Sequence, residues 1–123
     1  MIEIALAHRL PYVASTTSGY IMDIEKKVKK ALEFKGPKFI HILTPCIPGW
    51  GVEDNMAIEI GKLAQKTGFF PVVEFENGEL TIKLTDLDIL YQGILKEDNI
   101  VEGTFTQMGQ SFDMKLTKKE GEG

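Results

Sequence analysis

The chain has only one cysteine, Cys46, among its 123 residues, so it cannot form an internal disulfide bond. It also has no run of about 18 apolar residues, so we expect no membrane-spanning helix. Its first eight residues, MIEIALAH, lack the basic segment and the long apolar stretch of a signal peptide. These absences predict a cytoplasmic protein without a membrane span, and the length of 123 residues predicts a single domain.

Positive charge and phosphate-binding glycine motifs are also scarce. The net charge is −4 and the isoelectric point is near 5.2, which argues against a nucleic-acid partner. The one basic cluster consists of four lysines within residues 26–30, and it is interpreted as the solvated face of a helix or as a docking patch. Neither a Gly-x-Gly-x-x-Gly motif nor a P-loop is present, so nucleotide binding by this chain alone is not expected.

Residues 2–8 fit the end of a helix. The three segments that come after it in the first half have the pattern of a parallel β-α-β unit. Residues 11–17 are rich in β-branched and aromatic side chains, which predicts the first strand. Apolar residues recur at helical spacing over 21–35, and Gly36-Pro37 ends that helix. The apolar run 39–43 comes next as a second strand. Such a unit predicts two neighbouring parallel strands with a helical crossover.

A second helix and a hairpin come next in the sequence. Residues 53–67 form an amphipathic pattern with acidic residues in the first turn and Gly68 after the end. Asn77-Gly78 then separates two β-rich arms within residues 69–84, and this dipeptide favours the type I′ turn of a β-hairpin. Pro71 confines the first arm to a sheet edge or to its own outer end.

The pattern weakens after residue 84. Leu87, Ile89, Leu90 and Tyr91 are compatible with a short helix, and three glycines (Gly93, Gly103 and Gly109) interrupt the remaining sequence. Residues 118–123, KKEGEG, are expected to be disordered. We therefore predict an α/β domain with a hairpin over residues 1–84 and a C-terminal extension over residues 85–123.

Cys46 lies in the segment PCIPGW, residues 45–50, directly after the strand 39–43. Loops at the carboxyl ends of strands often carry the sites of open α/β sheets. From the residues alone, a single free cysteine is more often a buried packing residue than a ligand. His8 and His41 have no zinc-site spacing to it, and His41 fits a packed strand residue. Trp50 could cover a cofactor or close an edge of the core.

Several segments, in order, resemble the C-terminal part of the β subunit of pyruvate:ferredoxin oxidoreductase, also called pyruvate synthase. They are PYVAS at 11–15, KGPKFI at 35–40, PCIPGW at 45–50, EIGKLA at 59–64 with Thr67-Gly68, and ENG at 76–78. The resemblance covers about residues 4–84, and residues 103–123 have no counterpart in it. It implies an α/β fold, namely the C-terminal part of a three-layer thiamin-diphosphate-binding fold with parallel strands, followed by a β-hairpin.

The resemblance also implies cofactors. The complete subunit would bind thiamin diphosphate with Mg²⁺ and a [4Fe-4S] cluster. Three cluster cysteines of that family lie near the subunit's N-terminus, and the fourth corresponds to Cys46. A [4Fe-4S] cluster needs four thiolates, so this chain supplies one metal ligand and cannot hold the cluster unaided. The Gly-Asp-Gly segment that binds the diphosphate is absent, so no thiamin-binding or catalytic residue is assigned, and a truncated or split subunit is expected.

By this resemblance, the complete enzyme would be an oxidoreductase of anaerobic metabolism. It would oxidatively decarboxylate pyruvate with coenzyme A and pass electrons through [4Fe-4S] clusters to ferredoxin. Its expected partners are the other subunits of the complex, and this chain alone is not expected to be active. The choice of pyruvate among 2-oxo acids rests on the Pro-Gly-Trp end of the cysteine loop. The alternative is a non-catalytic α/β interaction module that has lost the chemistry.

Overall fold

A computed structural model describes residues 1–84, 89–95 and 100–117 of the chain. The helices are α1 (Ile2–Ala7), α2 (Ile21–Glu33), α3 (Ile47–Trp50), the 3₁₀ turn η1 (Asp54–Met56) and α4 (Ala57–Lys66). The strands are β1 (Tyr12–Thr17), β2 (Lys38–Leu43), β3 (Val73–Glu76), β4 (Glu79–Leu84), β5 (Ile89–Leu95), β6 (Ile100–Gln107) and β7 (Gln110–Thr117). Among these described segments, every helix is too short or too polar to cross a bilayer.

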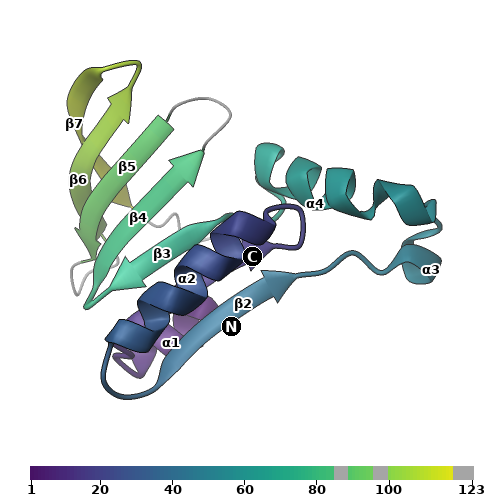
Figure 1. Ribbon diagram of the computed structural model, residues 1–123. Coiled ribbons are helices and arrows are strands. Elements are labelled where there is room, and N and C mark those ends of the chain that lie inside the picture. Colours follow the sequence, from purple (N-terminus) through teal and green to yellow (C-terminus); the bar gives the residue numbers. More distant parts are fainter. Residues whose placement is uncertain (85–88, 96–99, 118–123) are drawn as a thin grey trace, which may run out of the picture.

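The seven strands form one sheet in the order β2-β1-β3-β4-β5-β6-β7. Only β1 and β2 are parallel, and each later strand pairs with its neighbour in the antiparallel sense. Figure 1 shows that the helices gather around the parallel end, while the strands from β4 onward extend away from them. The sheet therefore combines a helix-covered parallel part with an antiparallel part built from local hairpins.

β1 is buried along its whole length because helices cover both of its faces. Val13 points to one face, where it packs in a cluster with Ala5 of α1 and Phe75 of β3. Tyr12 and Ala14 point to the opposite face, against α2. A strand covered on both sides cannot alternate polar and apolar residues, which explains its near-continuous β-rich sequence.

The structure confirms the predicted α/β architecture in its first 84 residues. The strands beginning at Tyr12 and Lys38 are parallel, with Val13 aligned to Phe39. The predicted helices occur over Ile21–Glu33 and Ala57–Lys66, and the hairpin turns at Asn77 and Gly78, whose φ angles of 49° and 90° are those of a type I′ turn. Pro71 precedes β3, which is an inner strand, so the proline lies at its outer end.

The prediction for the segment after residue 84 was wrong. Ile89, Leu90 and Tyr91 begin the strand β5 and not a helix, while Leu87 and residues 118–123 lie outside the described residues. Gly93 and Gly103 do not interrupt the strands either, because they are directly opposite each other in β5 and β6. Pairing with β4 overrides the weak helical pattern of this short segment.

Tyr91 explains why glycines are tolerated inside these strands. Its hydroxyl group crosses over Gly93 and donates to the carbonyl oxygens of Val101 in β6 (3.1 Å) and Met114 in β7 (3.2 Å). The side chain is only 3% exposed. A Cβ atom on Gly93 would lie 2.9 Å from this hydroxyl oxygen, so the glycine leaves room for the tyrosine that joins three strands.

Candidate functional site

The segment after β2 leaves the sheet and places Cys46 on the surface. Pro45 is buried, Cys46 is exposed, and the next residues form the single helical turn α3. The amide of Trp50 donates to the carbonyl oxygen of Cys46 at 2.8 Å, which closes this turn. Sequence patterns predicted a stiff loop here, but not that it contains a helical turn. The turn is possible because Pro48 stands in its first positions, where no helical amide hydrogen bond is required.

Cys46 is held by its own loop and not by the core. A Cβ atom on Gly49 would lie 2.8 Å from the sulfur of Cys46, so the thiol occupies the space that the missing side chain leaves. Gly51 then ends α3 in the left-handed conformation with φ of 65°. The interpretation of Cys46 as a buried packing residue is therefore wrong, because the thiol is open to an external metal or partner.

The other residues considered for chemistry are not assembled with Cys46 into a metal centre. His41 packs in the strand against the rings of Phe39 and Phe70, with centroid distances of 6.2 Å and 5.1 Å. His8 is exposed at the end of α1. Within the described ranges, no three His, Cys, Asp or Glu residues are grouped so as to hold a metal ion.

Trp50 lies beside this cysteine on the same turn, and its side chain is 46% exposed. An indole half open to solvent leaves an apolar surface on the same turn as the thiol, which a bound group or partner could cover.

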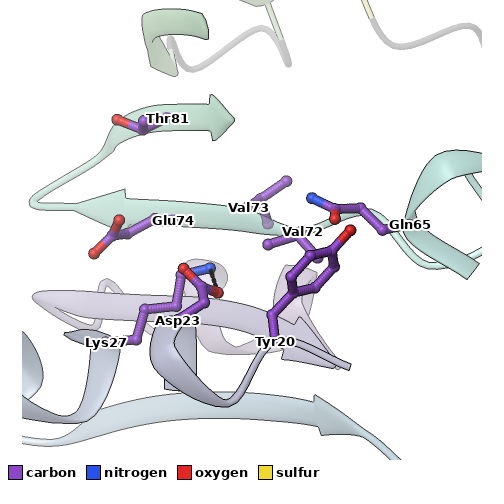
Figure 2. A pocket seen from close by; sticks show the side chains of 8 residues that line it. All are labelled: Tyr20, Asp23, Lys27, Gln65, Val72, Val73, Glu74 and Thr81. Atoms are coloured by element: carbon purple, nitrogen blue, oxygen red, sulfur yellow. Dashed lines mark hydrogen bonds and ion pairs between the residues drawn. The ribbon is translucent and has the colours of Figure 1, made fainter. Parts of the chain in front are cut away.

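A buried polar network on α2 was not predicted from the sequence. Lys27 is 6% exposed, and its ammonium group donates to Asp23 (2.7 Å) and to the carbonyl oxygen of Ser15 (2.8 Å). The same Asp23 oxygen accepts from the hydroxyl group of Thr16 at 2.7 Å. Figure 2 shows Asp23 and Lys27 directed into a recess between α2, β3 and α4. The interpretation of this lysine cluster as a solvated face was wrong for Lys27.

The spacing in the sequence could have revealed this network. Asp23, Lys27 and Ala31 are four residues apart and share one helix face, and Ala31 is buried against β1. A lysine between an apolar contact and an aspartate on one face is a candidate for a buried ion pair. Because the neighbouring Lys26 and Lys29 are exposed, the run of lysines concealed the different position of Lys27.

A second group of charges joins α2 to the β3-β4 hairpin. Lys30 forms ion pairs with Glu74 (3.3 Å) and Glu76, and the hydroxyl group of Tyr12 donates to Glu74 at 2.6 Å. Burial would lower the pKa of Lys30, but the hydrogen bond to Glu76 and the charge of Glu74 outweigh it and raise the pKa. Burial and the adjacent Glu74 also raise the pKa of Tyr12. The groups are mutually satisfied, which indicates a structural role.

We expect this arrangement to make the protein less stable in alkaline solution. Folding raises the pKa of Tyr12 above its ordinary value of 10.0, so its stabilising contribution is complete below about pH 10 and is lost as the pH rises further. Tyr12→Phe removes the titrating group and the hydrogen bond to Glu74, costing about 1 kcal/mol near neutral pH. It should also flatten the decline in unfolding free energy above pH 10, as measured by urea unfolding. An unchanged alkaline decline would contradict this.

The recess on α2 widens into an open groove of about 670 Å³. Its lining combines apolar side chains such as Ile21 and Met22 with charged ones, namely Lys26, Lys27, Lys30, Lys62, Asp23 and Glu74. Cys46 does not line it. Since Lys27 and Lys30 are already paired with the acidic residues, we assign this groove to the structural network and retain the Cys46 loop as the candidate functional site.

Comparison with known proteins gives a consistent set of relatives. No family model matches the chain. Over 82 residues it is 52% identical to pyruvate synthase subunit PorB of Methanocaldococcus jannaschii, covering 67% of this chain and 28% of that protein. The PorB subunit of Methanosarcina barkeri is 48% identical over 81 residues, covering 66% of this chain and 27% of that protein. The ketoisovalerate oxidoreductase subunit VorB of Pyrococcus furiosus is 42% identical over 84 residues, covering 68% of this chain and 27% of that protein.

These identities are far above what chance gives over such lengths, so two thirds of this chain is homologous to PorB and VorB subunits. The chain spans a little over a quarter of the length of the relatives. The resemblance to the β subunit of pyruvate synthase, first drawn from short segments of the sequence, is confirmed.

Proposed function

From this homology with subunits of 2-oxoacid oxidoreductases, we propose that the chain forms the C-terminal part of the thiamin-diphosphate-binding subunit of a cytoplasmic pyruvate:ferredoxin oxidoreductase. The complete enzyme would convert pyruvate and coenzyme A to acetyl-CoA and carbon dioxide and pass the two electrons to ferredoxin. PorB subunits are 39–52% identical to this chain and VorB subunits are 42% identical, so these ranges overlap, and the choice of pyruvate rests on the Pro-Gly-Trp end of the cysteine loop.

The role proposed for Cys46 is that of one thiolate ligand of a [4Fe-4S] cluster. Four thiolates are required and this chain has one, so the other three must come from the part of the subunit that this chain does not span. The exposed thiol supports this role, since a ligand must meet a cluster held mainly by another segment. Gly49 and the closed turn of α3 support it as well, because they fix the sulfur before its partners arrive.

Thiamin diphosphate with Mg²⁺ would supply the decarboxylation chemistry, and the [4Fe-4S] cluster would carry single electrons. No described residue is assigned to thiamin diphosphate. The proposed contribution of this chain is to position one sulfur at the carboxyl end of β2 and to complete the sheet that carries the loop.

A non-catalytic interaction module is the second candidate. Its support is that Cys46 is the one cysteine of this chain, whereas a [4Fe-4S] cluster needs four thiolates. Such a module would bind the same partner subunits without adding a ligand. The two candidates therefore differ in whether Cys46 contacts iron.

The test is to isolate the tagged chain from its own cells with its associated subunits and to compare wild type with Cys46→Ser. We expect the wild-type complex to reduce ferredoxin with pyruvate and to give the low-temperature EPR signal of a reduced [4Fe-4S] cluster. Cys46→Ser should change or abolish that signal and lower ferredoxin reduction at least ten-fold, while pyruvate binding changes little. A serine oxygen replaces the sulfur at nearly equal size but is a harder ligand.

Thr44→Ser is the matched control, because it alters the same exposed loop without touching the thiol. It should leave both the EPR signal and the rate unchanged. A Cys46→Ser complex with a normal signal and normal electron transfer would exclude the ligand role. A complex that contains the partner subunits but no activity with pyruvate or with ketoisovalerate would favour the non-catalytic module.

A further inference from the structure

β7 is the last strand of the sheet, and its outer edge has no strand beside it in the described structure. Its eight residues are all exposed. Figure 1 shows this strand at the far end of the sheet from the helices. An unpaired edge presents free N–H and C=O groups, and proteins usually shorten such an edge, cover it or place proline in it. β7 is eight residues long and has no proline, and among the described residues no element covers its outer edge. Of the usual protections it has charged side chains, Asp113 and Lys115, so the question is what pairs with an edge of this composition.

The side chains of β7 alternate strictly between two kinds. Phe112, Met114 and Leu116 are opposite Phe105, Gly103 and Val101 of β6, so they continue the apolar sheet face that contains the core. They remain 55%, 38% and 37% exposed. The other face of β7 has polar residues, Ser111, Asp113, Lys115 and Thr117. The apolar surface therefore reaches the free edge and stops there.

The hairpin turn fixes which backbone groups face outward. Met108 and Gly109 have φ angles of 49° and 81°, which makes a two-residue type I′ turn, so the flanking pair Gln107 and Gln110 is hydrogen-bonded. Hydrogen-bonded and non-hydrogen-bonded pairs then alternate along β6 and β7. Met114 consequently bonds inward, consistent with its carbonyl oxygen accepting from Tyr91. Asp113 and Lys115 direct their N–H and C=O groups to the free edge.

We propose that the edge of β7 pairs with the β7 edge of a second copy of this chain, around a two-fold axis at Met114. In this antiparallel register Asp113 is opposite Lys115 of the other copy, and Lys115 is opposite Asp113. Phe112 meets Leu116, and the apolar face continues across the axis. Both charge pairs and both apolar pairs are formed because the sequence from 112 to 116 is complementary to itself, as a two-fold interface requires.

Neighbouring registers fit less well. A shift of one residue places apolar side chains on the polar face of the partner. A shift that moves the axis to Asp113 puts two aspartates opposite each other. Only the register centred on Met114 pairs opposite charges while all outward-facing residues from 111 to 117 exchange backbone hydrogen bonds. Lys115 already lies 3.4 Å from Glu102 and would be shared between the two carboxylates.

Charge exchange tests this register. The full chain should behave as a dimer of twice 13.8 kDa in analytical ultracentrifugation at tens of micromolar. Lys115→Asp places like charges opposite each other and should weaken the dimer at least ten-fold. The double variant Asp113→Lys/Lys115→Asp restores opposite charges and should restore the dimer. Both residues are exposed, and the ion pair of Lys115 with Glu102 that both variants lose lies on the surface, so folding should change little, as circular dichroism would verify.

Disulfide formation tests the position of the axis. In the Cys46→Ser background, Met114→Cys should form an intermolecular disulfide rapidly, because non-hydrogen-bonded partners have Cα atoms about 4.5 Å apart. Phe112→Cys is the matched control. Its copies would lie roughly 14 Å apart along the strands and should not cross-link. A monomer at all concentrations, a dimer insensitive to Lys115→Asp, or equal cross-linking of the two cysteine variants would overturn the proposal.

Discussion

Replacing Gly103 by alanine is expected to lower the free energy of unfolding by about 4 kcal/mol or more, because no space exists for a methyl group between β5 and β6. A Cβ atom at Gly103 would overlap the carbonyl oxygen of Gln92 and the Cα atom of Gly93. These are backbone atoms of the adjacent strand, so no side chain can rotate away. The strands would have to separate, and the Tyr91 hydrogen bonds to Val101 and Met114 would be lost.

Urea unfolding followed by far-UV circular dichroism measures this loss. Gly68→Ala is the matched control, since Gly68 has a positive φ of 72° but nothing within 4 Å of the added Cβ atom. Backbone strain alone costs about 1–2 kcal/mol. If Gly103→Ala were no more destabilising than Gly68→Ala, the close approach of β5 and β6 would be wrong.

Removal of the Lys27 ammonium group is expected to have the second large effect. Lys27→Ala leaves Asp23 without its cationic partner beside β1 and opens a space under α2, so we expect a loss of about 3–5 kcal/mol. Asp23 is 36% exposed, and partial solvation of its carboxylate places the expected value toward the lower end of this range. Thermal and urea unfolding of the two proteins provide the measurement.

Two further variants separate the buried ion pair from the general effect of losing a lysine. Lys29→Ala removes an exposed partner of Glu25 on the same helix and should cost less than about 0.5 kcal/mol. Asp23→Asn/Lys27→Met removes both charges, keeps an acceptor for Thr16 and should recover part of the stability. Equal losses for Lys27→Ala and Lys29→Ala would show that Lys27 is not buried in solution.

The candidate site was partly predictable. The position of Cys46 directly after an apolar strand marked this loop as a place for a site, and the resemblance of the PCIPGW segment to pyruvate synthase gave the prediction that Cys46 is a cluster ligand. Whether the thiol was buried or open was not predictable, because composition favours burial of a free cysteine. The outcome depended on Gly49 and the turn of α3, which hold the sulfur outside the core.

The sequence by itself determined the local secondary structure and the homology to known proteins. The helix of α2, the parallel pair β1 and β2, and the turn at Asn77 and Gly78 arise from side-chain periodicity and from backbone preferences of single residues, which act over a few positions. Homology with PorB and VorB subunits likewise rests on the residues alone.

Tertiary structure alone decided the burial of Lys27, the strand at Tyr91 and the pairing of Gly93 with Gly103. Each depends on a partner from another element. Lys27 donates to Ser15 of β1, and Tyr91 donates to Val101 of β6 and Met114 of β7. Gly93 of β5 lies opposite Gly103 of β6. Periodicity predicts which side chains share a face of a helix or strand, but it does not predict which other element packs against that face. The physical reason is that the free energy of these contacts arises only when separate segments pack together.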